Sequence, residues 1–172
     1  MSLEDIVYRL EKEIPGYNRR PFTYNDLEQL CLKEKIILIE TELVCEGMLI
    51  CQPGERPCIF LNKRLTPLGY KTFVGFHEYF HYKFHPGSVH VYLRSPLWYR
   101  QIEQQADILA ALAVIPTPCL VRDLLMGENI ASIAEKYNVP ELLVAGRLKI
   151  LEEYRNLLMG RGIVLEEVVG RE

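Results

Sequence analysis

The sequence predicts an α+β protein that is mainly helical, with a small, largely antiparallel sheet of three strands. The strands are expected at Ile36–Glu40, Gly47–Cys51 and Cys58–Asn62, three short apolar segments joined by short loops. On both sides of them, apolar residues recur at helical spacing. The 172 residues are enough for one domain with a substantial core, and no internal repeat divides them. We therefore expect a single domain over residues 1–172.

Two helices are expected ahead of the sheet. Residues Ile6–Glu13 form an amphipathic pattern that the Pro15–Gly16 pair ends. Thr23 and Asp26 then have the spacing of a capping box, in which each side chain accepts the other residue's backbone N–H. A second helix should begin there and continue to about Lys35.

A longer helix should follow the third strand and lie beside the sheet. Thr66 suits the N-cap position and Pro67 the first helical position, and the Pro86–Gly87 pair would end the helix. Gly69 and Gly75 each cost about 1 kcal/mol relative to Ala inside a helix, and a closely passing backbone would explain Gly75. The aromatic stripe expected to face the core consists of Phe73, Phe76, Phe80 and Phe84.

The second half of the chain predicts a series of helices. Two begin with a cap residue followed by proline, which is a common way to start a helix. Glycine or proline marks where these two end. The expected helices run from Ser95 to just before Pro116, from Thr117 to Gly127, from Ile130 to Tyr137 and from Pro140 to Met159.

Composition and charge argue against several classes of protein. The formal net charge of −3 is unfavourable for a strongly electrostatic nucleic-acid binder. No apolar run approaches the roughly 20 residues of a membrane helix, and the acidic start Met1–Asp5 does not predict a signal peptide. The five cysteines are odd in number and lack C-x-x-C spacing. We therefore expect a cytoplasmic protein with no membrane partner.

The motif that organises the chain is His77-Glu78-x-x-His81. Residues four apart on a helix lie one turn above each other, so both imidazoles can be directed at one point. Two imidazoles are half of a tetrahedral zinc site. Glu78 would lie beside the metal, where it can take a proton from a metal-bound water. The alternative is a buried helix whose two histidines are hydrogen-bonded core residues.

The helix after Ser95 offers the rest of the site. Glu103 and Asp107 are four residues apart and share a face with Ala106 and Ala110. Small residues on that face would let this helix approach the His77 helix closely. Glu103 would then be the third metal ligand, and Asp107 would accept the free N–H of a ligand histidine. The alternative is a solvated acidic face.

Other polar residues near the motif are weaker candidates. His85 lies one turn beyond His81, but three imidazoles in line along a straight helix do not converge on one ion. A peptidase also needs a donor to the oxyanion that forms on the attacked carbonyl. The candidates for that role, or for substrate binding, are His90, Tyr92, Tyr99 and Arg100.

The two motifs together resemble the ImmA/IrrE metallopeptidases. The resemblance rests on His77-Glu78-x-x-His81 followed by Glu103-x-x-Ala106-Asp107-x-x-Ala110 and a stop at Pro116, and it covers roughly residues 25–150 in element order. The same spacing resembles the wider gluzincin pattern. The resemblance implies a zincin-like fold, with the small sheet beside the metal-binding helices.

The resemblance also implies roles and partners. It makes His77, His81 and Glu103 zinc ligands, Glu78 the general base and Asp107 the group that orients a ligand. Members of the family are soluble bacterial proteins that cleave, or relieve repression by, helix-turn-helix repressors. The implied function is a zinc-dependent endopeptidase with a helix-turn-helix transcriptional repressor as its protein substrate.

Two other functions stay open at this stage. Residues 130–159 have the rhythm of a helix-turn-helix, which would make the protein a DNA-binding module. The segment from Pro140 to Val144 is apolar and acidic where DNA contacts belong, so the sequence favours a packing unit and argues against direct DNA binding. A regulator that binds a repressor, or only a metal, without cutting would carry the same site residues.

Overall fold

The computed structural model describes the backbone of residues 2–85 and 97–160, and the side chains of residues 2–85 and 101–153. These ranges contain seven helices and three strands. In chain order the elements are α1 (Leu3–Glu13), α2 (Tyr24–Lys33), β1 (Ile37–Thr41), β2 (Gly47–Ile50), β3 (Cys58–Asn62), α3 (Leu68–Phe84), α4 (Leu97–Val114), α5 (Thr117–Leu125), α6 (Ile130–Tyr137) and α7 (Glu141–Gly160). The prediction of a mainly helical α+β fold with a small sheet is confirmed.

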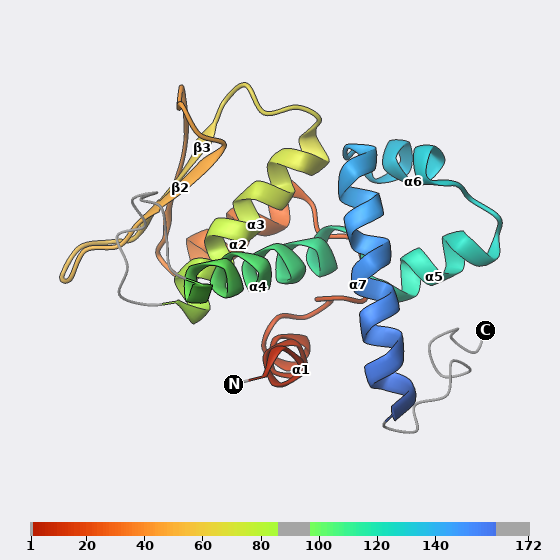
Figure 1. Ribbon diagram of the computed structural model, residues 1–172. Coiled ribbons are helices and arrows are strands. Elements are labelled where there is room, and N and C mark those ends of the chain that lie inside the picture. The colour runs from red at the N-terminus through yellow and green to blue at the C-terminus, as the bar shows by residue number, and fades with distance from the viewer. Residues whose placement is uncertain (1, 86–96, 161–172) are drawn as a thin grey trace.

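The centre of the molecule is the pair of helices α3 and α4, which pack side by side (Figure 1). The sheet lies at one end of this pair and α5, α6 and α7 lie at the other (Figure 1). Ala106 and Ala110 of α4 are fully buried. Their small side chains let the two helix backbones approach closely. The residues expected to carry the site therefore lie at the main helix–helix interface.

The sheet is mixed, so the prediction of a largely antiparallel sheet is wrong for one of its two strand pairs. β3 lies in the middle, antiparallel to β2 and parallel to β1. Consecutive strands reverse direction, so β1 and β3 run the same way and become a parallel pair once they are neighbours. In this central strand the Ile59 and Leu61 side chains are fully buried in the core.

The start of α2 follows the local sequence, whereas the start of α3 does not. Thr23 and Asp26 form the predicted capping box. In α3, however, Pro67 is the N-cap and the helix begins at Leu68, so the prediction of Thr66 as the N-cap is wrong by one residue. No side chain caps α3. The C-terminal end of α6 packs against the first turn of α3. This contact joins segments that are distant in the sequence.

The glycines of α3 show where that contact is tightest. A Cβ on Gly69 would collide with the backbone carbonyl oxygens of Tyr137 and Asn138. At Gly75 the nearest neighbour is the Leu27 side chain rather than a backbone, so the expected backbone approach occurs at the other glycine. Both glycines let α3 lie close to neighbouring segments, at Gly69 the end of α6 and at Gly75 the Leu27 side chain of α2.

Polar contacts fix the far end of α3 and the position of α4. The Tyr79 hydroxyl and the Lys83 ammonium both donate to the Glu34 carboxylate at the end of α2, at 2.8 and 2.9 Å. The buried Tyr17 hydroxyl donates to the backbone carbonyl of Leu109 at 3.0 Å. Buried hydrogen bonds of this kind are costly to break, because the partner left behind is unsatisfied.

The helices after α3 follow their predicted boundaries closely, whereas α1 begins at Leu3, ahead of the predicted start at Ile6, because Ser2 and Asp5 form a capping box. α4 ends at Val114 and Pro116 is the N-cap of α5, so the predicted stop is confirmed. Asn138, at the end of α6, has a left-handed backbone with φ of 56°. Val144 and Arg147 of α7 are buried, and Arg147 donates to the carbonyl of Ile115 at 2.8 Å. This helix therefore packs on the end of α4.

No single helix in the described ranges has both the length and the apolar character to cross a membrane. Residues Gln101–Val114 and Thr117–Leu125 together meet the criterion of length and composition, but they are bent by 62° at their junction. Core helices of a soluble protein can meet the same criterion, and most of this α4 segment is buried against α3 and the rest of the core.

Two helical glycines give a matched test of the α3–α6 contact. Gly69→Ala should lower the free energy of unfolding by about 1 to 3 kcal/mol, because the added methyl group overlaps backbone atoms. Gly146→Ala in α7 has nothing within 4 Å of the added Cβ and should raise it by up to about 1 kcal/mol. Urea denaturation measures both, and equal effects of the two substitutions would contradict the contact.

Candidate metal centre

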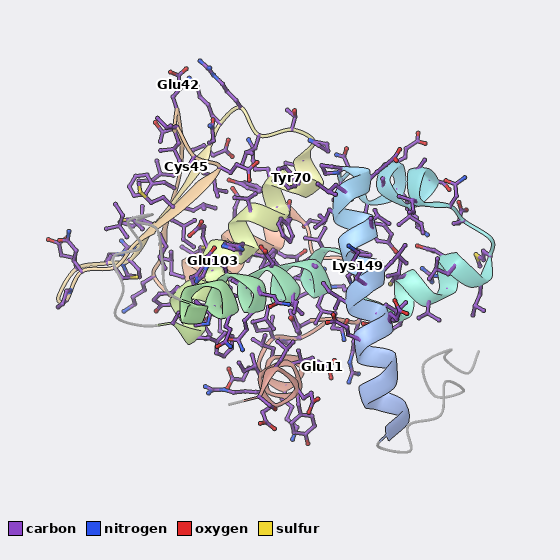
Figure 2. The ribbon with its side chains drawn as sticks, viewed as in Figure 1. Glu11, Glu42, Cys45, Tyr70, Glu103 and Lys149 are labelled. Carbon is purple, nitrogen blue, oxygen red and sulfur yellow. The ribbon has the colours of Figure 1, made fainter. Side chains whose placement is uncertain are left out.

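Three side chains from two helices converge at one point between α3 and α4. The Nε2 atoms of His77 and His81 lie 2.9 Å apart. Glu103 of α4 approaches them from the other side, with Oε2 at 3.3 Å from Nε2 of His77 and Oε1 at 3.2 Å from Nε2 of His81. Figure 2 shows Glu103 where α4 passes α3. All three ligand atoms lie within 4.8 Å of one another, so the group could hold a metal ion.

The spacing of these atoms leaves them close enough to share one ion. Ligands about 2.0–2.1 Å from a zinc ion at tetrahedral angles are roughly 3.3 Å apart. The two Nε2 atoms are 2.9 Å apart, and each lies 3.2 or 3.3 Å from a different oxygen of Glu103, so the carboxylate faces both imidazoles. The donor set of two imidazoles and one carboxylate is also one that zinc accepts. The side chain of His81 is 3% exposed and that of Glu103 is 24% exposed, so solvent reaches the point from the carboxylate side.

Asp107 lies behind His77. Its Oδ1 is 2.8 Å from Nδ1 of His77, on the opposite side of the ring from Glu103. When the ring is neutral, a carboxylate there accepts a hydrogen bond from Nδ1–H, so that the Nε2 lone pair is directed at the common point. The arrangement matches the geometry that the spacing of Glu103 and Asp107 predicts.

His85 does not join the three converging residues. Its Nδ1 is 3.0 Å from Nδ1 of His81, the ring nitrogen that points away from the metal position. Its Nε2 is 2.9 Å from Oε1 of Gln105 on α4. The structure therefore places His85 behind a candidate ligand, and not at the ion.

Glu78 borders a small cavity beside the three converging residues. It is buried, with 6% of its surface exposed. Burial raises the pKa of its carboxyl group, against the opposing attraction of the two histidines. The cavity has a volume of about 200 Å³ and is lined by Glu46, Gly47, Phe73, Val74, His77, Glu78, Glu103 and Asp107.

Gly47 makes room for the Glu78 side chain. A Cβ at position 47 would lie 3.0 Å from Oε1 of Glu78 and 2.8 Å from a methyl group of Val74. The first residue of β2 thus has to be small for the carboxylate to keep its position. The sequence analysis missed this role, and the only signal was a glycine at the head of a strand.

On the side away from β3, the backbone groups of β2 next to the cavity pair with no other strand of the described residues, and the Gly47 carbonyl accepts a hydrogen bond from the Cys45 thiol at 3.2 Å. The backbone N–H of Asn62 donates to the carbonyl of Glu46 at 2.9 Å, which fixes the alternation of the antiparallel ladder. The N–H and C=O groups of Gly47 and Leu49 then point away from β3. Among the residues that the structure describes, β2 is a terminal strand of the sheet, so an extended chain could pair with it.

The electrostatics of the site depend on the histidines. Burial by itself would lower the pKa of His77, but hydrogen bonds to Asp107 and Glu103 outweigh it and raise the pKa to about 10. Burial would raise the pKa of Glu103, and the bonds to His77 and His81 more than reverse this, so its pKa is lowered. In the metal-free protein the carboxylates of Asp107 and Glu103 thus keep His77 protonated at neutral pH.

The other predicted site residues are not tested by the structure. His90 and Tyr92 fall outside the described residues, as do the side chains of Tyr99 and Arg100. Gln105 was not predicted from the sequence, because a single glutamine on a helix gives no signal until its neighbour is known.

Comparison with known protein families identifies the family of this chain. The family model Peptidase_M78, described as the IrrE N-terminal-like domain, matches residues 44–149. This segment starts just before β2 and ends within α7, so it contains all eight residues that line the cavity and more than half of the chain. No curated protein matches the chain.

The raised pKa of His77 predicts how stability depends on pH. Its folded value of about 10 lies above the ordinary value of 6.5, so the stabilising contribution is complete below pH 6.5 and is lost as the pH rises toward 10. The free energy of unfolding of the metal-free protein should therefore fall between pH 7 and 9, below the range in which tyrosines ionise. Denaturant titrations at several pH values measure this.

The matched variant is His77→Gln, which should show a flatter profile over the same range. With zinc in excess the slope for the wild-type protein should vanish or reverse, because metal binding requires deprotonated ligands and improves as the pH rises. Identical slopes for wild-type and variant proteins without metal would contradict the assignment.

Proposed function

We propose, from the premise that the chain belongs to the Peptidase_M78 family of IrrE N-terminal-like metallopeptidases, that it is a zinc-dependent endopeptidase. The family match covers residues 44–149, a segment that spans both site helices. The single observation that carries the proposal is the convergence of His77, His81 and Glu103, whose ligand atoms lie within 4.8 Å of one another. A buried carboxylate, Glu78, borders the same point.

The proposed mechanism assigns a role to each of these residues. His77, His81 and Glu103 hold the metal, and Asp107 keeps the His77 ring in the orientation that directs Nε2 at it. A bound zinc ion would supply a Lewis acid and lower the pKa of a coordinated water to about 7. The Glu78 carboxylate accepts a proton from the water that attacks the peptide carbonyl. It then delivers this proton to the leaving amine.

The substrate is proposed to bind as an added strand. The outward N–H and C=O groups of Gly47 and Leu49 can pair with an extended peptide. Since Gly47 touches Glu78, a peptide on this edge passes beside the cavity. A folded protein must expose an extended segment to bind in this way, which favours cleavage in a linker or a loop.

The proposed substrate is a helix-turn-helix transcriptional repressor. Support comes from the resemblance to the ImmA/IrrE metallopeptidases and from the IrrE-like character of the matched domain. A regulator that captures the repressor without cutting it is the competing function. The two differ in one product, which is a repressor fragment with a new amino terminus.

Glu78→Gln tests the mechanism. The zinc-loaded variant should keep its metal content, because Glu78 is not among the three converging residues, and should lose cleavage by about 100- to 10,000-fold. Cleavage of a helix-turn-helix repressor and of a library of unstructured peptides is read by mass spectrometry. Glu55→Gln, a change at an exposed loop carboxylate, is the matched control and should cleave like the wild-type protein.

The contrary results are distinct. Full cleavage by Glu78→Gln would rule out this residue as the general base. A wild-type protein that binds zinc and repressor but yields no fragment with either substrate set would favour the non-catalytic regulator.

Gly47→Ala tests the placement of Glu78 from the opposite side of the cavity. The added methyl group should push the carboxylate away and reduce kcat at least several-fold, with zinc affinity close to that of the wild-type protein. Steady-state kinetics and zinc titration measure the two effects separately. An unchanged kcat would show that the position of the Glu78 side chain does not depend on this strand.

A further inference from the structure

Both candidate ligand histidines have their second ring nitrogen engaged, but by different groups. Nδ1 of His77 faces the carboxylate of Asp107 at 2.8 Å. Nδ1 of His81 faces another imidazole, that of His85, at 3.0 Å. The chain continues from His85 Nε2 to the side-chain oxygen of Gln105 at 2.9 Å. One histidine is therefore backed by a charge and the other by a neutral relay.

The direction of the protons in the relay follows from the metal position. If Nε2 of His81 carries the metal, the neutral ring has its proton on Nδ1 and must donate it. Nδ1 of His85 then has to be the acceptor, which leaves the proton of His85 on Nε2. That N–H needs an acceptor in turn, and Oε1 of Gln105 occupies the position. The orientation of the glutamine amide is the one that the metal-loaded tautomer requires.

The backbone makes the relay possible. His85 is the C-cap residue of α3, and its N–H donates to the carbonyl of His81 at 2.9 Å. The C-terminal end of α3 thus places the His85 ring next to the His81 ring, with ring centroids 5.0 Å apart. On α4, Glu103 is a candidate ligand, Gln105 contacts His85 and Asp107 contacts His77. A shift of α4 would disturb all three together.

We propose that His85 and Gln105 are positioning residues that fix the tautomer and the ring orientation of His81 for metal binding. The inference rests on the proposed function, because it assumes that His81 binds a metal through Nε2. His85 is thereby neither a ligand nor a catalytic residue, and its contribution is to slow the loss of the metal. Supporting groups of this kind change metal affinity by about 10- to 100-fold.

A near-isosteric pair of substitutions tests the role of His85. In His85→Asn the side-chain oxygen occupies the place of Nδ1 and still accepts the proton of His81, whereas His85→Leu has a methyl group there. His85→Leu should release zinc to a chelator about 10- to 100-fold faster than the wild-type protein, and His85→Asn within about threefold of it. Thermal unfolding of the metal-free variants shows whether both remain folded. Equal release rates for the two variants would overturn the proposal.

Nitrogen-15 NMR of the zinc-loaded wild-type protein is a second measurement that needs no variant. It should show His81 protonated at Nδ1 and His85 protonated at Nε2, and Gln105→Met should reduce the Nε2–H population of His85. A His85 ring protonated at Nδ1 would overturn the relay, even in a protein that binds zinc and cleaves peptides. A wild-type protein that binds no zinc would instead overturn the proposed function, and this inference with it.

Discussion

The close packing of α4 against α3 is the constraint on which the site depends. Two imidazoles on one helix provide two donor atoms, and a third has to arrive from a different element. Ala106 and Ala110 are buried at the contact, and their small size brings the Glu103 carboxylate within 3.3 Å of both Nε2 atoms. A larger residue at either position would hold the helices apart and leave the histidines without their acidic partner. The same contact places Asp107 next to His77 and Gln105 next to His85.

Charge balance explains why so many acidic groups can share this small space. Glu78, Glu103 and Asp107 all border the cavity, and like charges at short range in a partly buried site repel each other strongly. A divalent cation would compensate most of that charge. Without one, the carboxylates hold a proton on His77 and raise its pKa. The site thus gains a cation in either state, and metal binding has to displace a proton.

The sheet contributes more to the site than its size suggests. β2 lies at the edge of the sheet, and its first residue touches the side chain of Glu78. A single strand therefore limits the room for a buried carboxylate and presents backbone groups along the neighbouring edge. The mixed strand order matters here, because it places β3 in the centre and leaves β2 at the end near α3.

The sequence by itself determined the local features of this protein. The HExxH spacing put two imidazoles on one face of a helix, the Glu103–Asp107 spacing put two carboxylates on another, and prolines and cap residues set most helix boundaries. These features depend on residues within a few positions of one another, which is the range over which periodicity and capping act. The tertiary structure decided the strand order, the first turn of α3, the fit of Gly47 against Glu78 and the place of His85 behind His81. Each of those depends on contacts between segments far apart in the chain or on a side-chain direction at a helix end, and neither leaves a periodic signal in the sequence.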